Sequence, residues 1–203
     1  MCAFDSPADT RDLPLCRIEL APAGPGCAGL NPLLRTGVGV SVPGPVSVRV
    51  LLCGILEFDP EFVETRVATV FLNSQPVDDL DAVSARPGDT LALAAAMPGI
   101  AGITMRRNSP VKALRADITC PQAAGEGSPA AGGTVTVKLF NFSALEAGPG
   151  LLARGVVAPA EALARALRDC SRHVRSLTLD GKPATPAELA AVPGDVRLVA
   201  TAG

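Results

Sequence analysis

A repeat within the chain constrains its fold more than any other sequence feature. The first copy reads VFLNSQP over Val70–Pro76 and PGDTLAL over Pro87–Leu93, and the second reads LTLDGKP over Leu177–Pro183 and PGDVRLV over Pro193–Val199. Each copy has the pattern of a strand, a two-residue turn, a proline, a connector and a Pro-Gly-Asp turn before a last strand. Because a sequence repeat marks a repeated structural unit, we predict two related small domains.

A glycine- and proline-rich segment separates the two copies. Residues 119–133 (TCPQAAGEGSPAAGG) hold four Gly, two Pro and almost no side chain that a core would bury, which predicts a linker. We therefore expect one domain at 1–118, the linker at 119–133 and a second domain at 134–203. A chain of 203 residues is long enough for two such domains, each with a modest core.

The second copy has the clearer periodicity. Apolar residues recur at helical spacing over Ala160–Cys170, after a proline that suits a first helical turn. Alternating or apolar runs predict strands on either side of this helix, with a turn at Gly148–Gly150; the expected strands are Thr134–Phe140, Leu151–Ala158, Val174–Asp180 and Val196–Thr201. The order predicts an α+β fold in which one helix packs across a mixed sheet.

The first copy follows the same order with insertions. Its opening strand is expected at Arg17–Leu20, and Leu33–Val40 matches Leu151–Val157 of the second copy. The repeat predicts a helix at Ser47–Leu56, although the alternation at its start is typical of a strand. The extra residues of this copy predict a further turn around Glu57–Arg66.

Two motifs of the second copy connect it with a known family. The strand and turn at Leu177–Pro183, the VPGDVRLV run at Val192–Val199 and the element order over Thr134–Gly203 resemble those of the β-grasp sulfur carriers of the ThiS/MoaD type. The resemblance implies two tandem β-grasp, ubiquitin-like domains, the first of them divergent and carrying a C-terminal extension. It also implies a protein partner, namely an adenylating or sulfur-transfer enzyme.

The resemblance directs attention to the C-terminus. Carriers of this type are activated at the carboxylate of a terminal Gly-Gly, and this chain ends in Ala202-Gly203. If the chain is a working carrier, the resemblance implies that Gly203 is the reactive terminus. The first copy runs into a tail-like stretch at Ala95–Gly102 and then continues, so it offers no free carboxylate.

A segment after the first copy is the candidate partner-binding surface. Apolar, adaptable side chains there precede a basic run, and such methionine-bearing segments often meet a partner; the candidates are Met97, Pro98, Gly99, Ile100, Met105, Arg106 and Arg107. Two other interpretations stay open: the apolar residues cover their own sheet, and the basic residues form a solvated face.

The residues offer no catalytic or metal-binding constellation. His173 is the only histidine, and the six cysteines form no Cys-x-x-Cys pair. The cluster of Asp78, Asp79 and Asp81 lacks the glycine and trailing glutamate of a calcium loop, which favours a solvated turn. We therefore expect no cofactor and no enzymatic activity.

Composition narrows the class further. A net charge of −2 and the absence of Trp and Tyr disfavour nucleic acid as a partner, and no run of eighteen apolar residues is present to span a membrane. The isolated cysteines predict a cytoplasmic protein. The predicted function is a non-catalytic protein related to sulfur carriers that docks an adenylating or sulfur-transfer enzyme. The alternatives are a functional carrier ending at Gly203 and a small enzyme with a site between the domains.

Overall fold

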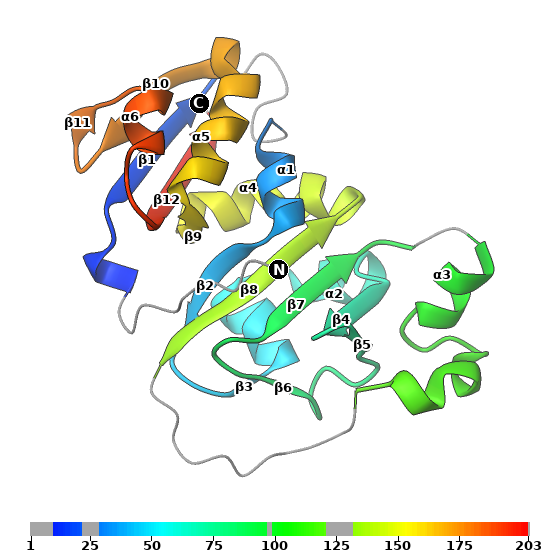
Figure 1. The fold of residues 1–203 in the computed structure, drawn as a ribbon. Helices are drawn as coiled ribbons and strands as arrows, with labels where there is room; N and C mark the ends of the chain where they lie inside the picture. Colours follow the sequence, from blue (N-terminus) through cyan, green and yellow to red (C-terminus); the bar gives the residue numbers. More distant parts are fainter. Residues whose placement is uncertain (1–9, 22–28, 97–98, 121–131, 203) are drawn as a thin grey trace. The chain divides into compact units, whose positions relative to one another are not determined.

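Helices and strands alternate along the chain, and both parallel and antiparallel strand pairs occur, which confirms the predicted α+β class. A computed structural model describes residues 10–21, 29–96, 99–120 and 132–202 (Figure 1). These residues form two compact units. Unit 1 lies within Ser41–Ser143, and unit 2 comprises residues up to Val40 together with those from Ala144 onward.

Both copies of the repeat have the same order of elements. The first consists of β1 (Leu15–Leu20), α1 (Asn31–Thr36), β2 (Val38–Val42), the π-helical η3 (Val50–Ile55), β4 (Thr69–Leu72), β5 (Gln75–Pro76) and β7 (Thr90–Ala94). The second consists of β8 (Gly133–Phe140), α4 (Phe142–Arg154), β9 (Val156–Pro159), α5 (Ala160–Asp169), β10 (Val174–Leu179), β11 (Lys182–Pro183) and β12 (Asp195–Ala202).

Additional elements decorate each copy. The first copy adds β3 (Val46–Ser47), α2 (Pro60–Thr65), β6 (Ser84–Ala85), α3 (Gly99–Met105) and the 3-10 segment η4 (Lys112–Ile118). The second adds the short η5 (Ser171–His173) and α6 (Pro186–Ala190), and η1 (Thr10–Asp12) precedes β1.

The two copies exchange their first strands. In unit 1 the last strand of the first copy, β7, pairs in parallel with β8, the first strand of the second copy. In unit 2 the last strand of the second copy, β12, pairs in parallel with β1, the first strand of the first copy. The expected boundaries at 1–118 and 134–203 describe the repeat in the sequence, whereas each compact unit takes strands from both copies.

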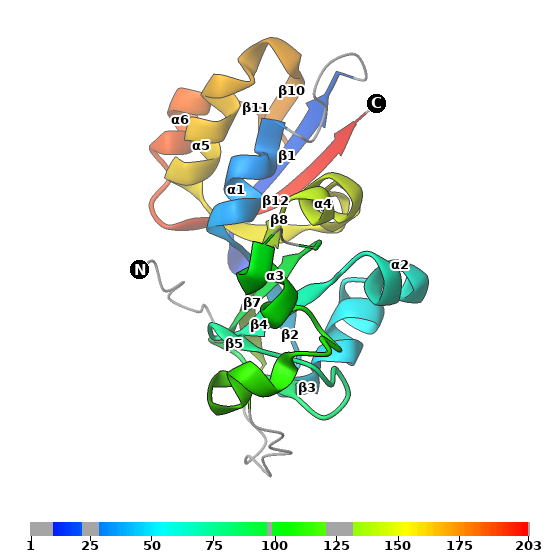
Figure 2. The same cartoon turned by 90° about the vertical axis from the view of Figure 1, so that its right-hand side faces the viewer.

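The strand orders of the two units differ at their two inner positions. Unit 1 has the order β2-β8-β7-β4-β5, and unit 2 has the order β9-β12-β1-β10-β11. The last strand β7 therefore pairs with the third strand β4 in unit 1, whereas the exchanged first strand β1 pairs with the third strand β10 in unit 2. Strand β2 passes from one unit to the other after Val40, and its Gly39 pairs with Val157 of β9 inside unit 2. Figures 1 and 2 show η3 and α2 on one face of the unit 1 strands, and α5 and α6 together on one face of the unit 2 strands.

The predicted strand at Leu151–Ala158 is wrong in its first half. Residues up to Arg154 continue α4, and the strand β9 begins only at Val156. The predicted turn at Gly148–Gly150 is wrong as well, since these residues lie inside α4. The buried residues Ala144, Ala147, Leu151 and Leu152 follow helical spacing, so burial of this face stabilises the helix despite an internal proline.

The predicted helix of the first copy is confirmed. Residues from Val48 to Ile55 are helical, and Val48, Leu51 and Leu52 are fully buried. The strand-like alternation at its start forms β3, whose Val46 pairs with Ala85. The insertion around Glu57–Arg66 contains the helix α2, which Asp59 caps by accepting from two backbone N–H groups. Burial of these side chains therefore outweighs the local strand propensity, and the segment is helical as the repeat predicted.

None of the helices in the described part of the chain is long and apolar enough to cross a membrane.

Candidate functional site

The exposed large apolar side chains of the described residues concentrate on α3 and η4. Seven such side chains are exposed, and five of them lie within Gly99–Ile118: Ile100, Ile103, Val111, Leu114 and Ile118. The most exposed are Ile100 at 83% and Leu114 at 78%. We call these five residues the α3–η4 surface. Since soluble proteins rarely gather exposed apolar side chains in one segment, this surface is a candidate interaction site.

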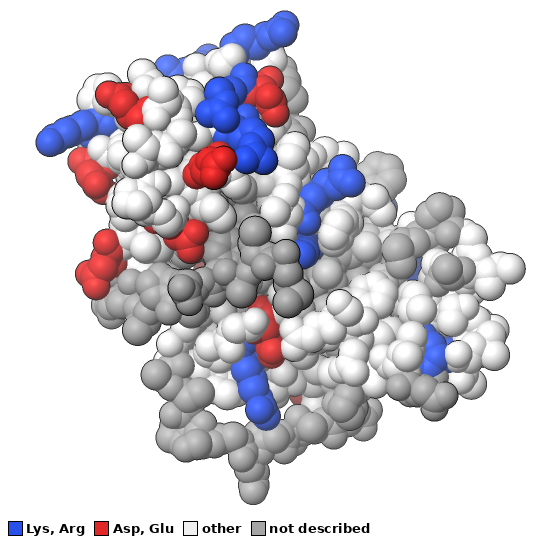
Figure 3. All heavy atoms as spheres, viewed as in Figure 1, with Lys and Arg blue, Asp and Glu red and all other residues white. Residues whose placement is uncertain are grey.

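The surface lies beyond the β4–β5 edge of unit 1, as Figures 1 and 2 show. On the face drawn in Figure 3, the region over α3 is mainly uncharged. The apolar stretch predicted after the first copy therefore does not only cover its own sheet. Part of it faces solvent.

Hydrogen bonds tie this extension to unit 1. The Arg107 N–H donates to Ala68 O (2.8 Å), and the Cys120 N–H donates to Pro76 O (2.9 Å). The buried Arg115 guanidinium donates to Thr104 O (2.7 Å) and forms an ion pair with Asp78 (2.7 Å). These contacts hold α3 and η4 in place although the five apolar side chains of the α3–η4 surface are exposed.

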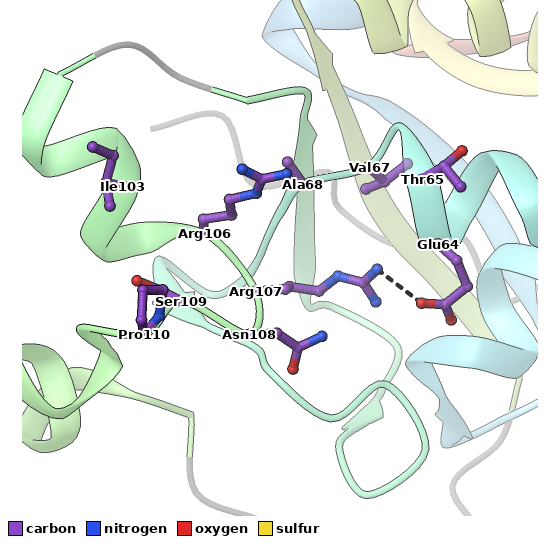
Figure 4. A pocket seen from close by; sticks show the side chains of 10 residues that line it. All are labelled: Glu64, Thr65, Val67, Ala68, Ile103, Arg106, Arg107, Asn108, Ser109 and Pro110. Carbon is purple, nitrogen blue, oxygen red and sulfur yellow. Dashed lines mark hydrogen bonds and ion pairs between the residues drawn. The ribbon is translucent and has the colours of Figure 1, made fainter.

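A pocket opens beside this surface. Its cavity is about 470 Å³, and it lies between the chain from Glu64 to Ala68 and the chain from Ile103 to Pro110 (Figure 4). Figure 4 shows the side chains of Arg106 and Arg107 extending toward this first stretch. Ile103 belongs both to the pocket wall and to the α3–η4 surface, so the two features are continuous.

The two arginines of the pocket differ in environment. Arg107 is buried, with 6% of its side chain exposed, and its Nη2 donates to Val63 O (3.0 Å) and to Glu64 Oε2 (3.3 Å). Its Nε is buried and has no acceptor among the described residues. Arg106 is exposed and forms no ion pair with any residue that the structure describes. The pocket therefore holds one guanidinium that uses only part of its donors, that of Arg107, and one that has no ion pair within the described part of the chain, that of Arg106.

An ion-pair network borders the pocket. Glu64 lies between Arg107 and Arg49, and Arg49 also pairs with Asp81, each of its two contacts being 2.8 Å. The hydrogen bond from Arg49 lowers the pKa of the Glu64 carboxyl, so Glu64 is ionised at neutral pH. Asp78 and Asp81 thus form ion pairs with Arg115 and Arg49, respectively. Asp79 accepts a hydrogen bond from the Asp81 N–H in a local turn.

The structure gathers part of the predicted partner-binding set. Arg106 and Arg107 line the pocket, and Ile100 belongs to the α3–η4 surface. Gly99 and Met105 are the ends of α3. Met97 and Pro98 lie outside the described residues. That the residues of this set contact a partner remains a prediction.

The sequence did not point to the other pocket residues. Glu64 belongs to α2, and Val67 and Ala68 lie between α2 and β4. All three come about forty positions before Arg107, and no local pattern links them to it. Leu114 and Ile118 are periodic apolar residues of a kind that usually faces a core. Only the structure shows that they are exposed.

The candidate carrier terminus lies at the end of a strand. Ala202 is the last residue of β12 and pairs with Leu20 of β1, and Gly203 lies outside the described residues. Among the described residues, no group of three His, Cys, Asp or Glu side chains could hold a metal ion. Burial raises the pKa of the Cys16 thiol to about 12 and also raises that of Cys170, so neither is an activated nucleophile.

Comparisons with protein-family models, with curated proteins and with solved structures found no match to this chain.

Proposed function

We propose that this chain is a non-catalytic docking protein built from two β-grasp-like units, and that a protein partner binds at the α3–η4 surface. The partner class that follows from the resemblance is an adenylating or sulfur-transfer enzyme. The partner segment that fits this surface presents apolar side chains together with an acidic group, because the adjoining pocket is lined by Arg106 and Arg107.

One observation carries the proposal. Five of the seven exposed large apolar side chains among the described residues lie in one segment of unit 1. Exposed apolar side chains lower the solubility of a protein. When such side chains lie together on elements that hydrogen bonds hold in place, they are typical of a surface that binds a partner. Large apolar anchors are also the groups that contribute most to interfaces once water is excluded from them.

The β-grasp part of the proposal is supported by the arrangement within each copy. Both copies place a helix between their second and third long strands and end on a strand in the interior of a sheet. In both copies the third long strand pairs with the two-residue strand that follows it, at the edge of the sheet. These features agree with the sheet and crossing helix that the resemblance implies.

The test compares partner recovery between variants of the tagged full chain expressed in its native host. We expect the unmodified chain to recover an adenylating or sulfur-transfer enzyme and Ile100→Ser/Leu114→Ser to lose it. Both positions are largely exposed, so the folded state should change in stability by only about 0.5 kcal/mol per substitution.

Two matched controls separate a specific surface from general loss of apolar area. Val50 and Leu145 are exposed to 50% and 51% and lie outside the α3–η4 surface. We expect Val50→Ser and Leu145→Ser to recover the partner like the unmodified chain. The proposal fails if no enzyme of either class is recovered, or if the control variants lose it to the same degree.

A further inference from the structure

We propose that the pocket beside α3, here called the Arg107 pocket, is a carboxylate-binding site that takes an acidic side chain of the docked partner. The inference rests on the proposed function, because the pocket shares Ile103 with the α3–η4 surface.

The first support is the contrast between two buried guanidinium groups. Arg115 uses all three of its nitrogens: Nε donates to Thr104 O, Nη1 to Thr119 Oγ1 and Nη2 to Asp78 Oδ1, at 2.7 to 2.9 Å. Arg107 donates only through Nη2 to described acceptors, although a guanidinium has five N–H donors. Buried donors without acceptors are costly, and native proteins rarely retain them without a use.

The second support is the charge balance around the pocket. The ion-pair network joins the guanidinium groups of Arg49 and Arg107 to the carboxylates of Glu64 and Asp81. The guanidinium of Arg106 adds a third positive charge in the pocket wall. Among the described residues these groups leave one positive charge unbalanced, that of Arg106, which has no ion pair there. A cluster with one excess positive charge next to an open cavity attracts an anion.

The same balance favours a carboxylate over a phosphate. A phosphate monoester carries about −1.5 to −2 charges at pH 7 and would exceed the single unbalanced charge. The ionised Glu64, which lines the pocket, would also repel it more strongly than it repels a carboxylate, because the repulsion grows with the charge of the ligand. A carboxylate has one charge and two oxygens, and it accepts paired donors from an arginine in one plane.

The rest of the pocket wall suits the stem of an acidic side chain. Val67, Ala68, Ile103 and Pro110 contribute apolar surface, and the cavity of about 470 Å³ is much larger than one carboxylate. Methylene groups can therefore pack against this wall while the carboxylate meets the arginines. Apolar neighbours in the partner segment would then contact the α3–η4 surface outside the pocket.

The experiment uses the full chain and two capped peptides, acetyl-Leu-Leu-Glu-Leu-amide and its glutamine counterpart. Binding is followed by proton–nitrogen correlation spectra that include the arginine Nε–Hε groups. We expect the glutamate peptide to shift the Arg107 Nε–Hε resonance and to bind about tenfold more tightly than the glutamine peptide. Added salt should weaken the glutamate peptide selectively.

Variants connect the effect to the two arginines. Arg106→Gln removes an exposed charge, and Arg107→Lys keeps the charge but loses the forked donors, so each should weaken the glutamate peptide about tenfold. Unfolding midpoints show whether Arg107→Lys stays folded. Arg172→Gln, an exposed change in unit 2, is the matched control and should leave binding unchanged.

Acetate and inorganic phosphate identify the source of the anion. Weaker binding of both than of the glutamate peptide supports the inference, and equal or tighter binding of either overturns it in favour of a small-anion site. Equal affinity for the two peptides also overturns it. If Ile100→Ser/Leu114→Ser loses the cellular partner while Arg106→Gln and Arg107→Lys retain it, the docking proposal stands and the carboxylate site fails.

Discussion

At the scale of single residues, the two copies use the same turn position to hold different strands. In unit 1 the Asn73 N–H donates to Thr90 O, and Asn73 Oδ1 accepts from the Thr90 N–H, both at 2.9 Å, which fixes the start of β7. In unit 2 the corresponding Asp180 makes the same pair of hydrogen bonds with Leu15, at 2.9 and 2.8 Å, and so fixes the start of β1. The turn residue of each copy, Asn73 or Asp180, thus forms the same pair of hydrogen bonds with the strand beside it, here called the clasp, although that strand differs between the units.

The two clasps should respond differently to exchange of their side chains. Asp180→Asn keeps the oxygen that accepts from Leu15, so we expect the free energy of unfolding to change by less than about 1 kcal/mol. Asn73→Asp keeps the acceptor for Thr90 but places a carboxylate where Nδ2 donates to Asp89 at 2.7 Å. Repulsion and the lost hydrogen bond should cost about 1–3 kcal/mol at neutral pH.

Urea denaturation of both variants measures the difference. The cost of Asn73→Asp should shrink as pH falls through the carboxyl range, because protonating one of the two carboxyl groups restores a donor between them. Equal effects of the two substitutions at pH 7 would contradict this account of the clasps.

At the scale of elements, the copies share a junction in which a helix ends at a glycine before a strand. Gly37 follows α1 with a φ of 121°, and Gly155 follows α4 with a φ of 106°. The paired leucines before each glycine are buried, as are Val38 and Val156 after them. The Leu-Leu-x-x-Gly-Val match in the sequence therefore encodes a helix end, and the strand expected there begins only after the glycine.

Alanine substitutions of two glycines near the end of α4 should change the free energy of unfolding in opposite directions. Gly155→Ala places a Cβ on a backbone with positive φ, so we expect a loss of about 1–2 kcal/mol. Gly150 lies inside α4 with no heavy atom within 4 Å of an added Cβ, so Gly150→Ala should stabilise the protein by up to about 1 kcal/mol.

Thermal or urea unfolding of the two alanine variants checks this. If Gly150→Ala also destabilises the protein, α4 does not continue through the Gly148–Gly150 segment.

At the scale of the whole molecule, the exchange of first strands makes each unit depend on both halves of the sequence. β8 is an inner strand of unit 1 and β1 is an inner strand of unit 2. An inner strand supplies hydrogen bonds on both edges and apolar side chains to the core, so neither unit is complete without the other half of the chain.

Cleavage between the copies should therefore leave them associated. With a protease site placed within residues 121–131, we expect the two fragments to elute together in native size-exclusion chromatography and to separate only in denaturant. The fragment 134–203 expressed alone should lack the far-ultraviolet signal of a folded unit, because it lacks β1, the strand that pairs with both β12 and β10. Separation of the fragments in native buffer would contradict the exchange.

Much of the element order was predictable, because it depends on local signals. The helix α5 and the strands β10 and β12 follow from periodicity, and the repeat correctly overrode the strand-like start of η3. The helix α4 was missed, since its glycines and proline are local signals for a turn while its stability comes from burial. The difference between a buried Arg107 and an exposed Arg106 was not predictable either, because adjacent residues of a basic run carry no mark of their environment.

The sequence by itself determined that this molecule is a duplication, and it placed the apolar and basic residues that adjoin the pocket in one segment. Local periodicity and turn chemistry suffice for that, since they act between near neighbours in the chain. Only the tertiary structure decided which copy each first strand joins and which arginine is left with unused donors. Strand alternation is equally compatible with either partner, so the choice is made by pairing between residues far apart in sequence, and the burial of Arg107 follows from the same long-range packing.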